Sequence, residues 1–113
     1  MFARVTTYEG PPERMDEGIR IYRDEVIPWL RDATGFRGWM VLLDRDANRA
    51  VSLTFWSSAE TAADQEATGG ALRDELADKL GTTMTSSGVY ELEVAEGLAL
   101  DDPGSSTGRA SPS

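Results

Sequence analysis

The sequence predicts an α+β fold of the ferredoxin-like type, with the order strand, helix, strand, strand, helix, strand. Two observations support this prediction. Hydrophobic residues recur at helical spacing in residues 15–33 and again in residues 62–80, and other segments have the composition of strands. In this order both helices cover one face of a four-stranded antiparallel sheet. The strand-like segments are residues 2–8, 36–43, 50–56 and 89–94.

The first strand and helix follow directly from the N-terminus. Residues 2–8 have a β-rich composition, and the Gly-Pro-Pro of residues 10–12 ends the strand and sets the first turn of a helix. Pro28 interrupts the helical pattern, so we expect a kink or a new start near Ile27. Gly35 is expected to end this helix. The expected inward face consists of Met15, Ile19, Tyr22, Val26, Trp29 and Ala33.

A hairpin is predicted in the middle of the chain. Its strands are residues 36–43 and 50–56, on either side of the polar turn 44–49. Ser57 and Glu60 match a capping box, which predicts that the second helix begins here.

The second helix is expected to run from Thr61 to Leu80. Gly69-Gly70 is a point at which it can divide, and Gly81 is expected to end it. Residues 89–94 then alternate as a last strand. One face of that strand would carry Tyr90, Leu92 and Val94.

The chain is expected to form one domain followed by a tail. With 113 residues in all, residues 1–97 are long enough for a single core. From residue 98 onward the composition shifts to Asp, Ser, Gly and Pro, which cannot bury enough apolar surface to stay folded. We therefore expect residues 98–113 to be a disordered acidic tail.

The predicted hairpin is apolar on both faces. Trp39, Val41 and Leu43 point one way, and Met40 and Leu42 point the other way. A sheet with one face in water should alternate apolar with polar residues. The second apolar face therefore needs a cover, and we expect a homodimer in which the open faces of two copies pack together.

The charge balance argues against nucleic-acid and membrane partners. The chain has 11 Lys and Arg against 20 Asp and Glu, a net charge of −9, and its basic residues are spread along its length. Phosphate backbones and anionic lipid surfaces would both repel it. Because no signal peptide, no membrane-length apolar run and no cysteine are visible, we expect a cytoplasmic protein.

The residue types also exclude several site chemistries. The absence of histidine and cysteine excludes an imidazole ligand to haem iron, the usual zinc sites and a Ser-His-Asp triad. Residues 44–48 imitate the start of a calcium loop, but Arg49 stands where glycine is needed and Phe55 where the closing glutamate belongs. No phosphate loop or dinucleotide fingerprint is present. We therefore expect neither a metal nor a bound cofactor.

Three segments carry a resemblance to a known family. They are Arg4-Val5-Thr6-Thr7-Tyr8, Val26-Ile27-Pro28 before Gly35-Phe36-Arg37-Gly38, and Leu53-Thr54-Phe55-Trp56-Ser57-Ser58. Together they resemble the antibiotic biosynthesis monooxygenase family of dimeric α/β-barrels, over about residues 2–95. The resemblance implies a dimer with a hydrophobic cavity in each subunit, between sheet and helices. Members of that superfamily include cofactor-independent oxygenases of anthrones and quinols, haem-degrading enzymes and proteins without known activity.

The candidate site residues are aromatic and cationic. The resemblance implies a catalytic tryptophan at Trp56 beside the cavity and a catalytic arginine on the second helix, where Arg73 is available. This sequence departs from the family's pattern at Ser52, where the anthrone oxygenases of the family have asparagine. An apolar pocket also needs aromatic walls, hydrogen-bond donors such as Tyr8 and a partner for a developing oxyanion. The expected substrate-binding residues are Tyr22, Trp29, Trp39, Ser52, Tyr90 and Arg4.

Each of these residues also has a structural interpretation. Aromatic residues at helical or strand spacing usually belong to the core, and an arginine on a helix is usually a solvated charge. Arg4 can form an ion pair with Glu91 or Glu93 across the sheet.

Two functions from different classes remain. The first is a cofactor-free monooxygenase that deprotonates a small aromatic, anthrone-like or quinol-like substrate, whose carbanion then passes an electron to O₂. The second is a non-catalytic dimeric domain that binds a small hydrophobic molecule. A cyclase or isomerase using the same pocket differs from the first only in consuming no O₂. We favour the first function.

Overall fold

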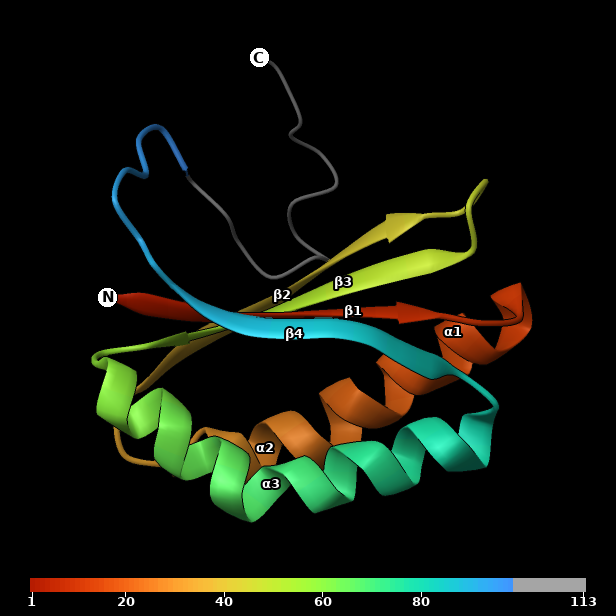
Figure 1. Cartoon of the computed structure of the whole chain (residues 1–113), viewed down its shortest axis with the longest axis horizontal. Helices are drawn as coiled ribbons and strands as arrows, with labels where there is room; N and C mark the ends of the chain where they lie inside the picture. The colour runs from red at the N-terminus through yellow and green to blue at the C-terminus, as the bar shows by residue number, and fades with distance from the viewer. Residues whose placement is uncertain (99–113) are drawn as a thin grey trace.

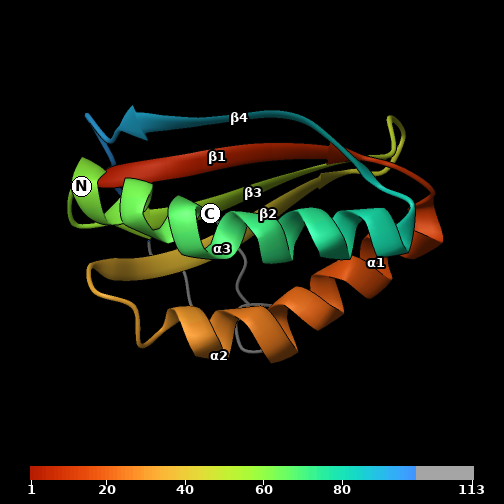
Figure 2. The ribbon, with the colours of Figure 1, turned by 60° about the horizontal axis from the view of Figure 1, so that its bottom comes forward.

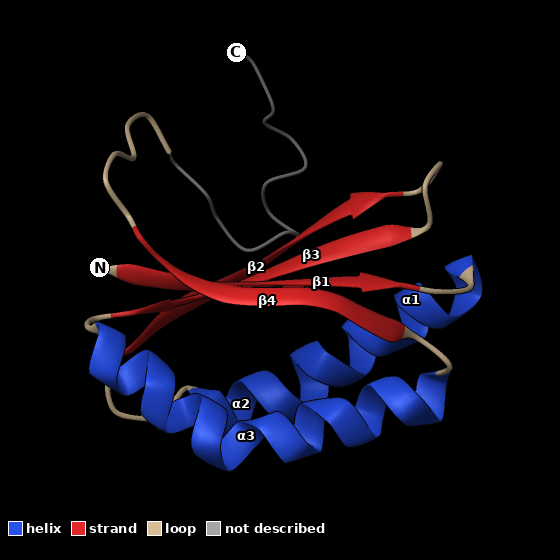
Figure 3. Ribbon diagram, viewed as in Figure 1, coloured by secondary structure: helices blue, strands red, loops and turns tan. Residues whose placement is uncertain are grey.

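The fold is a four-stranded antiparallel sheet with all helices on one face. The computed structural model describes residues 1–98, without the side chains of residues 66–69, 71 and 72. The strand order is β2-β3-β1-β4, and the helical layer lies below the sheet in Figures 1 and 3. The predicted ferredoxin-like order is therefore confirmed. The elements are β1 (Phe2–Glu9), α1 (Pro12–Ile21), the π-helix η1 (Tyr22–Val26), α2 (Ile27–Leu30), β2 (Phe36–Asp44), β3 (Arg49–Trp56), α3 (Ala59–Leu80) and β4 (Thr83–Glu91). The predicted tail, apart from Leu98, lies outside the described residues.

The sheet register decides which side chains face the helices. β1 pairs with both β3 and β4, and Arg4 lies opposite Thr54 on one side and Val89 on the other. A guanidinium nitrogen of Arg4 donates to the carbonyl of Ala62 in α3, at 3.4 Å. Because side chains alternate along a strand, the even-numbered residues of β1 and β3 face the helices. The odd-numbered residues of these strands form the open face.

The first helical segment is interrupted where the sequence predicts. Pro28 has no N–H to offer the carbonyl of Asp24, and its ring crowds that carbonyl. The chain widens into η1 just before the proline, where the N–H of Ile27 bonds to the carbonyl of Tyr22. The wider turn changes the helical phase, so Ile27 is buried while Trp29 is 48% exposed. The prediction that Trp29 faces inward, made from a regular helical period, is therefore wrong.

Helix α3 is continuous through Gly69-Gly70, where the sequence allowed a division. Its N-cap is Ser58, one residue later than predicted, and the Ser58 hydroxyl accepts from the Thr61 N–H at 3.1 Å. Thr61 completes the capping box by accepting from the Ser58 N–H, a role predicted for Glu60. Gly81 ends the helix in the left-handed conformation, as expected. Among the described residues, no helix is both long and apolar enough to cross a bilayer.

Strand β4 begins earlier than the sequence predicts. It runs from Thr83 to Glu91, whereas the alternating pattern pointed to residues 89–94. The early half of β4 is polar because it is an edge strand with exposed side chains, so it carries no apolar alternation. Leu92 and Val94 lie beyond the strand.

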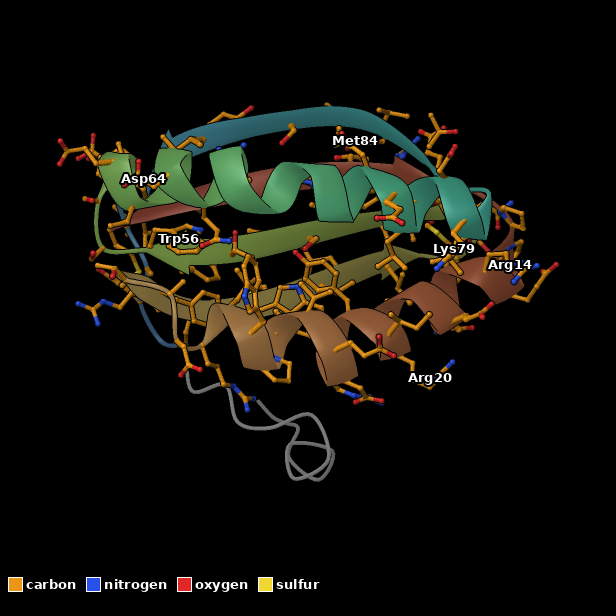
Figure 4. All side chains as sticks on the ribbon, turned by 90° about the horizontal axis from the view of Figure 1, so that it is seen from below. Arg14, Arg20, Trp56, Asp64, Lys79 and Met84 are labelled. Atoms are coloured by element: carbon orange, nitrogen blue, oxygen red, sulfur yellow. The ribbon has the colours of Figure 1, made fainter. Side chains whose placement is uncertain are left out.

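The core surrounds Trp56, between the sheet and the helices. Trp56 is 2% exposed and stands edge-on to Phe36, with ring centroids 5.5 Å apart. Its indole N–H donates to Oγ1 of Thr54 at 2.9 Å. In Figure 4 Trp56 lies near the start of α3, and Lys79 lies at the other end of that helix. The buried cluster consists of Val26, Ile27, Leu30, Trp56 and Ala62.

Candidate functional site

A pocket lies beside this core, between α1, η1 and α3 and under the sheet. Figure 2 shows α1 and α3 meeting at the end of the molecule where α3 leads into β4. The pocket encloses about 70 Å³. An apolar cavity of about 150 Å³ holds one benzene, so only part of an aromatic ring fits inside this half-open pocket. The lining residues are Tyr8, Met15, Gly18, Ile19, Tyr22, Trp39, Val41, Ala50, Ser52, Arg73, Leu76, Ala77, Leu80 and Thr82.

One wall of the pocket is aromatic. The rings of Tyr22 and Trp39 lie 5.3 Å apart at an angle of 34°. The indole N–H of Trp39 donates to Oγ of Ser52 at 3.1 Å, which fixes the orientation of the indole. Three residues predicted to bind substrate are thus brought together at one place, with Ser52 acting through Trp39.

Among the described lining residues, Arg73 supplies the one charged side chain. It projects from α3 and is half-buried. Its Nε is buried and has no hydrogen-bond acceptor among the described residues, although the side chain makes another interaction elsewhere. A cation in an otherwise uncharged wall favours a ligand that carries or develops negative charge.

Two predicted aromatic residues lie away from this pocket. Trp56, predicted as catalytic, belongs to the core cluster. Tyr22 and Trp39 pack against that cluster and also line the pocket, so they separate Trp56 from it. Trp29 points away from the pocket because η1 changes the helical phase.

Tyr90 and Arg4 are also outside the pocket. Tyr90 is 62% exposed and pairs with Ala3, which places it on the open face of the sheet. Arg4 faces the helices, but it donates to Oγ of Ser87 at 3.3 Å and to the Ala62 carbonyl. It therefore joins β1, β4 and α3.

The sequence contained a signal for the lining residues that were not predicted as site residues. Met15, Ile19 and Tyr22 form one stripe along α1 and η1, and all three line the pocket. Tyr22 was predicted to bind substrate, whereas Met15 and Ile19 were predicted only to face the core. Tyr8, predicted as a hydrogen-bond donor, also lines the pocket.

The described residues hold no group of three or more acidic side chains placed to bind a metal ion. The whole chain contains neither histidine nor cysteine. The lining residues able to contact a haem iron are therefore Tyr8, Tyr22 and Met15.

Sequence comparison finds relatives that are described as uncharacterised proteins. No family profile matches the chain. Protein Rv2557 of Mycobacterium tuberculosis is 33% identical over 95 residues, which cover 84% of this chain and 41% of the relative. Protein Rv2558 of the same organism is 37% identical over 60 residues, which cover 53% of this chain and 25% of the relative. This chain therefore spans less than half the length of these curated relatives.

Three solved structures share the fold at low sequence identity. A candidate antibiotic biosynthesis monooxygenase of Deinococcus radiodurans superposes with a TM-score of 0.67 at 16% identity, over 87% of this chain and 98% of that one. The cofactor-independent oxygenase SnoaB of Streptomyces nogalater superposes with a TM-score of 0.62 at 18% identity, over 84% of this chain and 95% of that one. The haem-degrader MhuD of Mycobacterium tuberculosis, with two haems bound in its active site, superposes with a TM-score of 0.61 at 18% identity. The match covers 86% of this chain and 100% of that one. The chain thus has the ferredoxin-like fold of the antibiotic biosynthesis monooxygenases, as its sequence resemblance indicates.

Proposed function

We propose that this chain is a cofactor-independent monooxygenase domain for a small aromatic substrate with an acidic C–H or O–H, such as an anthrone or a quinol. The observation that carries the proposal is the pocket with the Tyr22–Trp39 wall and the Arg73 cation. The shared fold of SnoaB, a cofactor-independent oxygenase, supports it. Because this chain spans 41% of Rv2557, the proposal concerns this domain.

The proposed reaction asks the protein mainly to bind, orient and desolvate. For an anthrone, a C–H bond of the methylene breaks, the proton leaves to water at the open side of the pocket, and the charge delocalises onto the carbonyl oxygen. The carbanion gives one electron to O₂, and recombination of the resulting radical with superoxide forms a C–O bond to a peroxide, which takes up a proton from water. Loss of water from the resulting hydroperoxide leaves a quinone, so O₂ supplies one carbonyl oxygen and one water.

Arg73 and the aromatic wall have separate roles in this scheme. Arg73 stabilises the enolate oxygen, an interaction that an apolar surrounding strengthens. Tyr22 and Trp39 hold the substrate ring, and Tyr8 donates a hydrogen bond. A substrate of two or three rings is larger than the 70 Å³ inside the half-open pocket. Its binding requires α1 to move from α3, or part of the substrate to stay outside.

The test is oxygen uptake with a simple anthrone. The metal-free protein is incubated under air and under nitrogen, and O₂ consumption and quinone formation are followed for wild type, Arg73→Met and the matched control Arg20→Met. Arg20 is exposed on the outer side of α1 (Figure 4). We expect equal amounts of O₂ consumed and quinone formed, a rate at least tenfold lower in Arg73→Met, and no change in Arg20→Met. Absence of turnover above background by the wild type would reject the proposal.

A non-catalytic binding domain is the second candidate. It is favoured by Ser52, which is engaged by Trp39 and stands where the anthrone oxygenases of the family have asparagine. Anthrone binding without O₂ consumption or product would select this function. A product formed without O₂ would select a cyclase or isomerase. The absence of histidine from the chain argues against a histidine-ligated haem.

We further propose a cytoplasmic homodimer formed through the open face of the sheet. That face carries the exposed Leu42 and the partly buried Leu53 and Phe55, an apolar surface that favours association. Leu42→Glu should convert the dimer to a monomer in sedimentation, whereas Arg20→Glu on the helical side should not. A wild-type monomer at micromolar concentration would rule out the dimer.

A further inference from the structure

Two hollows in the described part of the chain share one lining residue. The ligand pocket contains Met15 in its lining, and so does a smaller hollow at the turn between β2 and β3. Met15 is the one residue that the two linings share. It is 7% exposed, so a buried side chain borders both hollows.

The pocket has two chemically different ends. α1 and α3 run in opposite directions along it (Figure 2), and Gly18 allows close approach to Leu80, whose Cδ1 would lie 3.0 Å from a Cβ at that position. Arg73 lies seven residues before Leu80 on α3, a distance of about 10 Å along a helix axis. Arg73 therefore places its charge toward one end of the pocket, and Met15 and Leu80 lie toward the other end, where Tyr8 and Thr82 add two hydroxyl groups to the lining.

The hollow beyond Met15 differs from the pocket. Its rim includes Arg45 and Arg49, which form exposed ion pairs with Asp16 and Glu9 at 3.2 and 3.3 Å. The hydrogen bond and the charge of Asp16 raise the pKa of Arg45, so Arg45 stays charged within a rim of paired charges. An apolar ligand tail that passes Met15 would therefore reach an open, charged surface.

We propose that Met15 is a specificity-determining residue that sets how long a ligand the pocket accepts. The inference rests on the proposed ligand pocket and adds a substrate class. The ligand has an anionic or enolisable group at the Arg73 end and an apolar body that ends at Met15. Methionine suits this position because its flexible, polarisable side chain fills irregular space. Replacing it by a smaller residue joins the pocket to the hollow.

The test uses a ligand series that differs only in length. The dissociation constants of 4-alkylbenzoates, from methyl to octyl, are measured by equilibrium dialysis for wild type, Met15→Ala and Met15→Val. Each methylene buried by the pocket should lower the Kd about fourfold. In the wild type this gain should stop at a defined chain length. In both variants it should continue for one or more further methylenes.

Two control variants separate length from general loosening. Leu76→Ala enlarges a wall of the pocket that the hollow does not share. Met15→Leu keeps the side-chain volume nearly constant. In both variants the gain in affinity with chain length should therefore stop at the same length as in the wild type. Near-ultraviolet circular dichroism checks that each variant is folded.

The possible outcomes distinguish this inference from the proposed function. If the gain in affinity stops at the same ligand chain length in the wild type and in the folded Met15→Val and Met15→Ala variants, the role of Met15 is overturned. If the gain continues to a greater chain length in the Met15→Val and Met15→Ala variants but no oxygenase turnover is observed, the role of Met15 is supported and the oxygenase function is rejected. Absence of binding by every benzoate to every variant overturns the ligand pocket, and the inference with it.

Discussion

Trp56 is the residue for which a core role and a site role predict the most different effects of substitution on stability and on ligand affinity. The structure places its indole at 2% exposure, with its N–H donated to Thr54 at 2.9 Å. Trp56→Phe removes that donor and leaves the Thr54 hydroxyl buried, which costs roughly 1–3 kcal/mol. The smaller ring leaves a cavity that adds roughly 1–2 kcal/mol. We therefore expect a loss of about 2–5 kcal/mol in the free energy of unfolding.

Urea denaturation at fixed protein concentration measures this loss, and a thermal scan should show a Tm lower by roughly 10 °C or more. The double variant Trp56→Phe/Thr54→Val removes both partners of the hydrogen bond. It should be more stable, by about 1 kcal/mol, than the sum of the two single effects predicts. The affinity of the folded protein for an aromatic carboxylate should stay within about twofold of wild type, because Trp56 does not line the pocket.

The reverse pattern is expected for Trp39. Trp39→Phe should weaken binding of the same carboxylate severalfold and change stability less than Trp56→Phe does. A Trp56→Phe variant of unchanged stability and strongly reduced affinity would show that Trp56 is the pocket wall and that the core assignment is mistaken.

Two further predictions concern the support of the site. Gly35→Ala should cost roughly 3 kcal/mol or more by urea denaturation, because its φ is +85° and a Cβ would lie 2.6 Å from the capping hydroxyl of Thr61. Gly81→Ala, at φ +71° with open space around it, should cost only about 1–2 kcal/mol, so equal losses would contradict this explanation. Ser52→Ala removes the acceptor that orients Trp39 and should weaken aromatic binding about two- to fivefold in a fluorescence titration, while Ser52→Thr should retain most of the affinity. An Ser52→Ala variant with wild-type affinity would show that this hydrogen bond does not organise the wall.

The sequence was informative wherever a regular period determined burial. The stripe of Met15, Ile19 and Tyr22 along the first helix was predicted, and it lines the pocket. The period failed at Trp29, which turns outward because the proline at residue 28 makes the chain widen into a π-helix, whereas Val26 is buried as predicted. A local backbone irregularity of this kind changes the phase of every residue after it, and hydrophobic spacing alone does not reveal it.

The sequence predicted only part of the candidate site, because the packing decides which side chains reach the pocket. Tyr22, Trp39, Ser52 and Arg73 meet in one pocket because their helices and strands pack as the fold class requires. Trp39 and Trp56 look alike in sequence, each an aromatic residue within a strand. Only the packing distinguishes them, since Trp39 reaches the pocket while Trp56 is enclosed by Phe36 and the buried cluster.

A crystal structure with a bound anthrone, or with the quinone formed from it, tests the central claim most directly. We predict the ring system against Tyr22 and Trp39, with its oxygen within hydrogen-bond distance of Arg73 and with α1 displaced from α3 to admit it. A ligand found on the open face of the sheet, beside Tyr90, or at the exposed Trp29 would contradict the assignment of the pocket as the functional site.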